Sequence, residues 1–418
     1  MSNLKAVILS VSDVIVEKGE LVEETFAEVV KLIKFLQLKG LTPIVLARKK
    51  WVSIDDKTNE KHSLQDELFK HVKSFPWYCS DENNDIPTKD GSSKPVEYIL
   101  NKHQLKPNEV IYIGNSLTDM RTAVNSKVLF LNAKWYDSNT TYGFIFNSPR
   151  AIAKFIDIFC LRNHWWGFSI EKNGLRAYAL SIFSTYIEKY AMTSSDAKSA
   201  AKEGRGKLEF WAHYTISSIY FSGLYNEIDY IAPYPRHKAG TGNATIADVL
   251  DVFAKCFRIK YIPDLIMRHK DAEKSQTLRQ AKRQPSHLNQ INSIHLNKKP
   301  LKNSKGETYA KTPLAPDKTV LVIDDILTEG YSLDAARIYI ESTGAKVILL
   351  AWLKTINTHY HKGVKLAIND PYREHNFTTC DTDKIYSYGG YILNNKAQDE
   401  LDEKFKNYDN WSWPKELA

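Results

Sequence analysis

VLVIDDILTEGYS, residues 320–332, indicates the fold of the second half of the chain. Four apolar residues, Val320–Ile323, predict a buried strand, and two carboxylates, Asp324 and Asp325, follow directly. The remaining residues, 326–332, predict a loop, and the apolar periodicity after them predicts a helix. In an open parallel sheet, ligands bind where strands end and helices begin. The stretch therefore predicts a ligand site at one edge of a parallel α/β sheet.

The residue types in this loop suit a phosphorylated sugar. The start of a helix offers N–H groups and the positive end of a dipole, both of which attract phosphate. Thr328 and Ser332 add hydroxyl groups, and Gly330 lets the backbone approach a ligand closely. The two adjacent carboxylates can accept hydrogen bonds from the vicinal hydroxyls of a ribose. We therefore predict a site for a ribose that carries a 5-phosphate.

This pattern resembles the type I phosphoribosyltransferases, whose signature is an apolar strand, two acids, two mostly apolar residues and Thr-x-Gly-x-Thr/Ser. The resemblance implies that Asp324 and Asp325 bind the ribose hydroxyls of phosphoribosyl pyrophosphate. It implies a 5-phosphate loop made of Leu327, Thr328, Glu329, Gly330, Tyr331 and Ser332. It also implies Mg²⁺, bound through the ligand near the two aspartates. Pyrophosphate would leave through an oxocarbenium-like transition state, so catalysis would consist mainly of holding the sugar.

A second segment, IAPYPRHK at residues 231–238, supports this interpretation. It predicts a strand that ends in prolines, and its last residues resemble the pyrophosphate loop of the competence-F-type branch: Arg236, His237 and Lys238. A later pattern of that branch is similar to residues 268–279 with Lys282, Arg283 and Asn289. The chain lacks the branch's cysteine zinc module and has AGTGNA at 239–244. The acceptor substrate therefore does not follow from the resemblance, which covers about residues 200–357.

Residues 1–136 alternate apolar strands with amphipathic helices, which predicts another parallel sheet. They resemble a haloacid-dehalogenase-type phosphatase with little or no cap, most clearly at KPVEYIL, residues 94–100, and VIYIGNSLTD, residues 110–119. Four positions that carry chemistry in that family depart from its pattern: Ser10, Ser12, Ala47 and Asn115. Two positions match, namely Lys94 and Asp119. Because a phosphoaspartyl mechanism needs a carboxylate nucleophile and oxygen ligands for Mg²⁺, we predict no phosphatase activity here, but a scaffold or partner-binding role. Residual phosphate binding through Lys94 and an unidentified serine chemistry are the alternatives.

We predict four regions along the chain. They are a degenerate phosphatase-like domain at 1–136, a helical linker at 137–225, a phosphoribosyltransferase domain at 226–368 and a C-terminal extension at 369–418. Aromatic residues at helical spacing indicate packed helices in the linker: Trp165, Trp166, Tyr178, Phe183, Tyr186 and Tyr190. Stacking of these rings on nucleobases is the alternative. The predicted fold class is α/β, with two parallel-sheet domains joined by a helical segment.

The charge of the chain is concentrated in one segment. The whole chain carries +8, whereas residues 258–311 hold 13 Lys or Arg and 4 Asp or Glu, a net charge of +9. Such a local positive charge suits a diphosphate or a nucleic acid. The 4 cysteines form no CxxC pair, which excludes a zinc ribbon or a redox motif of that kind. No stretch reaches the roughly 20 apolar residues of a membrane helix, so we expect a cytoplasmic protein with no membrane partner.

The sequence leaves three functions open. The first is an Mg²⁺-dependent phosphoribosyltransferase fused to an inactive phosphatase-like domain. The second is a non-catalytic sensor of phosphoribosyl pyrophosphate or a nucleotide. The third is a regulatory module that binds nucleic acid through residues 258–311. Fusions of the two families resemble accessory proteins of bacterial defence systems, including retron-type ones, which suggests a protein partner or a homo-oligomer.

Overall fold

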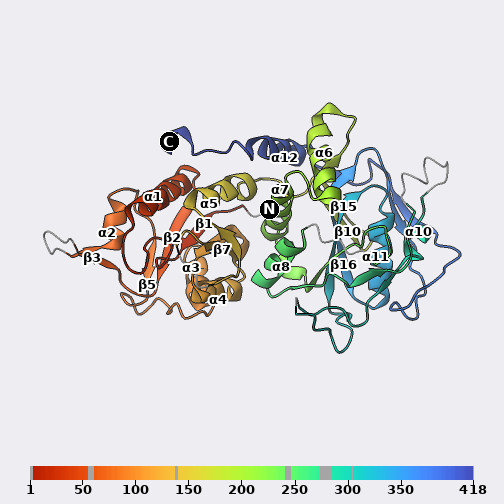
Figure 1. Ribbon diagram of the computed structural model, residues 1–418, viewed down its shortest axis with the longest axis horizontal. Coiled ribbons are helices and arrows are strands. Elements are labelled where there is room, and N and C mark those ends of the chain that lie inside the picture. Colours follow the sequence, from red (N-terminus) through yellow and green to blue (C-terminus); the bar gives the residue numbers. More distant parts are fainter. Residues whose placement is uncertain are drawn as a thin grey trace.

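The computed structural model describes residues 3–54, 61–136, 140–240, 246–273, 285–303 and 305–417. Two sheets with helices packed on them lie side by side as two lobes (Figure 1). The expected mixed α/β class, with a parallel first sheet, is confirmed. Among the described helices, none combines the length and the apolar character that a membrane span requires.

The first sheet is parallel, and its six strands follow the order β5-β2-β1-β6-β7-β8. The strands are β1 (Ala6–Leu9), β2 (Thr42–Ala47), β5 (Trp77–Cys79), β6 (Val110–Gly114), β7 (Leu129–Ala133) and β8 (Phe144–Phe146). Every residue of β1, β6 and β7 is buried. Helices on both faces of the sheet require this, and it accounts for the continuous apolar runs in the sequence.

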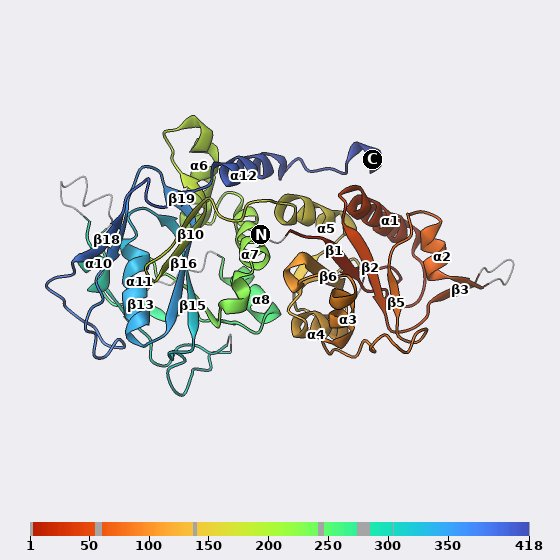
Figure 2. The same cartoon turned by 180° about the vertical axis from the view of Figure 1, so that it is seen from behind.

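The helices of this lobe form two layers around the sheet. They are α1 (Glu23–Leu38), α2 (Leu64–Phe69), α3 (Lys94–Lys102), α4 (Leu117–Asn125) and α5 (Pro149–Phe155), with short turns η1 (Pro107–Glu109) and η2 (Ile156–Cys160). Helices α1 and α5 cover one face, and α3 and α4 cover the other (Figures 1 and 2). A short hairpin of β3 (Val52–Ile54) and β4 (Lys61–Ser63) extends from the lobe.

The second sheet has seven strands in the order β12-β11-β15-β16-β10-β9-β19. They are β9 (Phe168–Lys172), β10 (Leu175–Phe183), β11 (Tyr230–Pro233), β12 (Lys260–Tyr261), β15 (Thr319–Leu327), β16 (Lys346–Thr355) and β19 (Ile392–Leu393). The first five in this order are parallel to one another, and β9 and β19 are antiparallel to their neighbours.

Helices cover both faces of this sheet as well. They are α6 (Glu188–Glu203), α7 (Leu208–Phe221), α8 (Ala247–Cys256), α10 (His287–Ile291) and α11 (Tyr331–Ser342), with the turn η3 (Leu224–Glu227). Buried residues of α6, α7 and α8 share one apolar cluster with Ile323 and Leu350, whereas those of α10 and α11 share another with Val322 and Leu349. Two small antiparallel pairs lie beside α11: β13 (Ile266–Arg268) with β14 (Ile294–Leu296), and β17 (Tyr360–Gly363) with β18 (Thr382–Tyr386).

The segment at 137–225, predicted as a helical linker, contains α5, α6 and α7 but also supplies three strands that we did not predict, β8, β9 and β10. Strand β10 lies inside the second sheet, between β16 and β9. It is buried on both faces, so its sequence shows no alternation of apolar and polar residues that would reveal a strand. The aromatic core is confirmed for Trp165 and Tyr178, which are 0% and 3% exposed, whereas Tyr186 is 99% exposed.

Helix α7 connects the two lobes through their cores. All twelve residues from Phe210 to Phe221 are buried, as expected for a helix that is apolar all round. Its His213 lies among phenylalanine rings of the first lobe, 5.1 Å from Phe155 and 5.4 Å from Phe159 between ring centroids. One apolar cluster therefore runs from the first sheet to one face of the second. The boundaries between the predicted regions stay a prediction.

The C-terminal segment returns to the first lobe. Helix α12 (Asn395–Asn407) packs on β10, where Gln398 Oε1 accepts a hydrogen bond from the Ile182 N–H at 2.9 Å. The chain then runs along the top of the molecule to α1 and ends near the turn η4 (Lys415–Leu417) (Figure 1). Trp411 Nε1 donates to Asp157 at 2.9 Å, and the Trp411 ring meets the Phe35 ring edge-on. The C-terminal segment thus joins the two lobes.

Candidate functional site

The two segments that the sequence predicts to bind one ligand leave neighbouring strands of the second sheet. Strands β11 and β15 are parallel partners, with Pro233 opposite Ile323. The Tyr234 N–H continues the ladder by donating to the Ile323 carbonyl at 2.8 Å. Parallel neighbours end at the same edge of a sheet, so the loop after β11 and the loop after β15 lie side by side.

Asp324 and Asp325 lie within β15 and not after it, because the strand continues to Leu327. Both side chains are half-buried. Asp324 Oδ1 accepts a hydrogen bond from the Asp325 N–H at 2.9 Å. Burial raises the pKa of Asp324 well above its ordinary value, and the neighbouring Asp325 carboxylate adds to this. A bound sugar hydroxyl or cation would relieve that repulsion.

The carbonyl groups of the loop after β15 are fixed by hydrogen bonds. The Thr328 carbonyl accepts from Lys354 Nζ at 2.6 Å, and the Glu329 carbonyl accepts from the His361 N–H at 2.9 Å. The Gly330 carbonyl accepts from the Asp334 N–H at 2.8 Å. The loop leads into the first turn of α11, so the positive end of the helix dipole lies at residues 330–331. A helix start of this kind attracts an anion.

Gly330 is required where the loop turns into α11. Its φ is +90°, a left-handed conformation that favours glycine. A Cβ at this position would lie 2.6 Å from Cε2 of Tyr360, which is fully buried. The Thr328 hydroxyl is 3.0 Å from the Thr355 hydroxyl on the next strand. The loop is therefore packed closely against β16 and β17.

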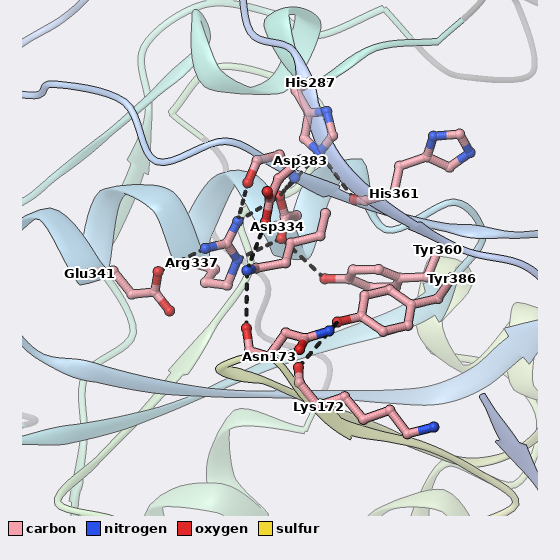
Figure 3. Close-up of polar contacts among 12 residues, drawn as sticks. Lys172, Asn173, His287, Asp334, Arg337, Glu341, Tyr360, His361, Asp383 and Tyr386 are labelled. Carbon is pink, nitrogen blue, oxygen red and sulfur yellow. Dashed lines mark hydrogen bonds and ion pairs between the residues drawn. The ribbon is translucent and has the colours of Figure 1, made fainter. Parts of the chain in front are cut away.

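A buried polar network holds the first turn of α11 (Figure 3). Asp334 accepts from Arg337 Nε at 2.6 Å and from the Gly363 N–H at 2.7 Å, and it lies 3.1 Å from His287 Nε2. Arg337 also donates to Glu341 at 2.7 Å. Burial alone would raise the pKa of Asp334, but His287 and Arg337 hold it below its ordinary value. The network ties α10 and β17 to the helix that begins at the loop.

We did not predict this network from the sequence. The three-residue spacing of Asp334 and Arg337 within a predicted helix was the available signal, because residues at this spacing share a helix face. His287 and Gly363 are distant in sequence, and only the fold brings them to the same point.

The predicted pyrophosphate loop exposes its basic residues. Arg236, His237 and Lys238 are exposed after the buried end of β11. Their backbone is fixed from a second segment, since Arg268 Nε donates to the Arg236 carbonyl at 2.6 Å and the Ala272 N–H donates to the His237 carbonyl at 3.0 Å. The side chains are thus exposed while the backbone is held, and Arg236 Nη2 also donates to the Ala201 carbonyl of α6 at 3.4 Å.

Arg268 is a framework residue. It is 5% exposed, and its Nη2 donates to the Tyr234 hydroxyl at 3.2 Å and to Gln290 at 3.1 Å. Asn289 binds backbone as well, donating to the Glu273 carbonyl at 2.8 Å. The other basic positions of this pattern lie outside the described residues: Arg279, Lys282 and Arg283.

The space beside the aspartates is nearly filled. Ala201 of α6, Leu250 of α8 and Trp352 of β16 leave a pocket of about 20 Å³ next to Asp324 and Asp325. A cavity of this size holds about one water molecule. A ribose on this face of the sheet therefore requires α6 or α8 to move outward.

The described residues alone do not complete a metal site. Among them, no group of three or more His, Cys, Asp or Glu side chains could hold a metal ion. Asp324 and Asp325 supply two carboxylates, and Mg²⁺ demands six oxygen ligands, usually with several waters and substrate phosphates among them. The donor set therefore fits Mg²⁺ only together with a phosphate-bearing ligand.

A second polar cluster lies at the carboxyl end of β1 in the first lobe. Lys89 Nζ donates to Ser10 Oγ at 2.7 Å and forms an ion pair with Asp119 at 2.5 Å. The three side chains are 8%, 0% and 0% exposed, in that order. Our assignment of Lys94 is corrected here, because Lys94 is exposed at the first residue of α3. Lys89 lies in the turn before α3 and Lys94 is the first residue of that helix, and only the fold of the turn shows which lysine points inward.

The remaining positions of this cluster carry no further carboxylate toward Lys89. Asn115 Nδ2 donates to the Ala133 carbonyl, Ser12 donates to Asp13 at 3.1 Å, and Ala47 is buried at the end of β2. Burial would raise the pKa of Asp119, but Lys89 and Ser116 hold it below its ordinary value. The single buried carboxylate is thus neutralised by a lysine, which does not suit Mg²⁺.

No family model and no curated protein matches the chain. Eighteen solved chains are similar to part of this chain, among them the following three. A protein assigned as a β-phosphoglucomutase from Bacteroides vulgatus is 14% identical over 37% of this chain and 88% of its own, with a TM-score of 0.27. One assigned as a phosphoglycolate phosphatase from Lactobacillus delbrueckii subsp. bulgaricus is 16% identical over 31% and 53%, with a TM-score of 0.24. A HAD-superfamily hydrolase, subfamily IA, variant 1, from Geobacter sulfurreducens is 11% identical over 37% and 96%, with a TM-score of 0.23. These values are too low to support a conclusion on activity.

Proposed function

We propose that the loops after β11 and β15 bind phosphoribosyl pyrophosphate and that the chain is an Mg²⁺-dependent phosphoribosyltransferase. The observation that carries this proposal is the loop at Thr328–Ser332. Its carbonyl groups accept hydrogen bonds from Lys354, His361 and Asp334, and the loop lies at the positive end of the α11 dipole, which attracts an anion. Two carboxylates precede this anion site on the same strand. Few ligands need both features together, and a ribose 5-phosphate is one that does.

Each part of the site has a role in such a reaction. The loop N–H groups and the α11 dipole bind the 5-phosphate, and Asp324 and Asp325 accept hydrogen bonds from the ribose hydroxyls. Arg236 and Lys238, exposed on the neighbouring loop, neutralise the diphosphate. Mg²⁺, when bound with the ligand, would stabilise the leaving pyrophosphate. The protein thereby contributes position and electrostatics, and its aspartates stabilise positive charge that develops on the sugar.

A non-catalytic sensor is the second candidate, and the pocket beside Trp352 favours it. With space for about one water molecule, this face offers an acceptor no place next to the sugar unless α6 or α8 moves. In the sensor, ligand binding would be followed by that movement and not by transfer. The first lobe serves both candidates as a phosphatase-like scaffold without activity, because Lys89 pairs with Asp119, the carboxylate of the polar cluster at the end of β1.

One experiment separates the two candidates. The chain is incubated with phosphoribosyl pyrophosphate, Mg²⁺ and a panel of purine bases, pyrimidine bases and amines, and pyrophosphate release and products are measured. A transferase releases pyrophosphate with a matching acceptor. A sensor binds the ligand and releases none above the uncatalysed rate. The absence of both binding and release would contradict the proposed function.

A further inference from the structure

Lys354 is a buried cation directly beneath the phosphate loop. It lies near the end of β16, opposite Leu327, and is fully buried. Its Nζ donates to the carbonyls of Thr328 at 2.6 Å and Thr358 at 2.9 Å, and also to the Thr358 hydroxyl. A longer bond of 3.2 Å reaches the Thr355 carbonyl. All of its acceptors in the described part of the chain are carbonyl or hydroxyl oxygens, and none is a carboxylate.

A buried ammonium group without a carboxylate beside it is costly. Burial lowers the pKa of Lys354 to about 7, against the weaker opposite effect of Glu329. Lysine is otherwise charged up to about pH 10.4. The Lys354 side chain is therefore only partly protonated at neutral pH. The Thr328 peptide group lies between this ammonium and the outer face of the loop.

Few other charged groups face Lys354 from the elements packed on it. The loop contributes Glu329, and β17 with the residue before it contributes His361 and His359. The rings of Phe168 on β9 and Tyr391 lie 5.8 and 5.5 Å from Nζ. Burial lowers the pKa of His361, and Lys354 adds a small part to this. His361 is thus the neighbour whose charge must be separated from that of Lys354 in any test.

We propose that Lys354 positions the phosphate loop and supplies its missing counter-charge, so that a phosphate monoester binds together with a proton at Lys354. This rests on the proposed function, since it concerns the same loop. The ligand is a dianionic phosphate monoester on the outer face, and the ammonium lies on the inner face. The phosphate and the Lys354 ammonium each offset the electrostatic cost of the other, because the Thr328 peptide lies between them and its carbonyl accepts a hydrogen bond from Nζ. Lys354 is a positioning residue, because it does not reach the ligand itself.

The sign of the pH dependence follows from this pairing. As the pH rises through 7, unliganded Lys354 loses its proton and the loop loses its buried charge, so affinity falls. Below about pH 6 the phosphate monoester gains a proton, and affinity falls again. We expect the tightest binding between these limits, with a loss on the order of tenfold between pH 7 and pH 8.5.

Calorimetric titration with ribose 5-phosphate tests the proposal. At pH 7, titrations in two buffers with different ionisation enthalpies should show uptake of about half a proton per ligand. The variant Lys354→Met should bind more weakly at pH 7 and lose the fall in affinity between pH 7 and 8.5. Lys354→Arg keeps its charge at all these pH values and should also lose that fall. A merely structural role would weaken binding in both variants but leave the slope with pH unchanged.

Two control variants isolate the effect. Lys346→Met removes an exposed lysine from the other end of β16 and should change neither affinity nor slope. His361→Gln removes the neighbouring group that titrates and should keep the slope. A slope that persists in Lys354→Arg, or one that disappears only in His361→Gln, overturns the inference while leaving the proposed function intact. If wild type binds no ribose 5-phosphate at any pH, the proposed function itself fails. If Lys354→Met does not fold, the pH dependence of affinity in Lys354→Arg still tests the inference.

Discussion

Replacing Gly330 with alanine should disrupt the loop after β15 and destabilise the second lobe. The new Cβ would lie 2.6, 2.8 and 2.9 Å from three ring atoms of Tyr360. Carbon atoms in ordinary contact are about 3.5–4.0 Å apart, so the loop or the ring must move by roughly 1 Å. The Tyr360 ring is fully buried, with its hydroxyl 3.4 Å from Asp334. It has little space into which it can move.

The expected cost has two parts. A non-glycine residue at the φ of +90° costs roughly 1–2 kcal/mol, and overpacking against Tyr360 costs roughly 1–3 kcal/mol more. The free energy of unfolding should therefore fall by about 2–5 kcal/mol. A shift of the loop N–H groups should also weaken charge-assisted hydrogen bonds worth roughly 1.5–3 kcal/mol, so that affinity for ribose 5-phosphate falls on the order of tenfold to a hundredfold.

Gly174→Ala is the matched control for this prediction. Gly174 has a φ of +72°, and no atom lies within 4 Å of a Cβ added there, so the variant carries the backbone cost without the collision. Urea unfolding and calorimetric titration are measured for both variants. In a Tyr360→Ala background, Gly330→Ala should cost less than it does in wild type, because the collision is gone. Equal stability losses in the two glycine variants, or unchanged ligand affinity in Gly330→Ala, would refute the reasoning.

Three further predictions concern other parts of the chain. Lys89→Met should remove the ion pair of the buried Asp119 and lower the free energy of unfolding by about 3–5 kcal/mol. Lys94→Met, at an exposed position, should change it by less than about 0.5 kcal/mol. Equal effects of the two substitutions would contradict our assignment of Lys89. The first lobe should release no phosphate from an aryl phosphate with Mg²⁺, and release that disappears in Ser10→Ala would show that it is an active enzyme. Asp324→Asn should raise the melting temperature at pH 8 and raise it less toward pH 4. Folding raises the pKa of Asp324, so this carboxyl destabilises the folded protein once the pH rises above the pKa of the unfolded state. A difference in melting temperature that is constant with pH would contradict this.

The order of strands and helices was largely predictable because most strands are short apolar runs next to turns. The segments at Ala6–Leu9, Val110–Gly114 and Tyr230–Pro233 all form parallel strands, as their composition indicates. The failure at Leu175–Phe183 has the same origin. A strand buried on both faces has no periodicity of two, so its apolar and aromatic residues resemble those of a buried helix.

The candidate site shows the same limit at the level of single residues. Local sequence placed Asp324, Asp325 and Gly330 on one strand and loop, and the fold brings Arg236 to the neighbouring loop. The local sequence could not place Lys354, because its role depends on a hydrogen bond to the Thr328 carbonyl, 26 residues earlier in the chain. Burial and long-range contacts decide such roles, and the spacing of residues in one sequence predicts neither of them.

The most direct test of the central claim is calorimetric titration of phosphoribosyl pyrophosphate with Mg²⁺ into wild type and into a variant with Asp324→Asn and Asp325→Asn. The double substitution keeps size and removes both charges from half-buried positions, so the fold should survive. A charge-assisted hydrogen bond is worth roughly 1.5–3 kcal/mol, and a neutral amide keeps part of it, so the two substitutions together should lower affinity on the order of tenfold to several hundredfold. We predict tight, Mg²⁺-dependent binding by wild type and this loss in the variant. A folded wild type that does not bind, or equal binding by both proteins, would contradict the claim.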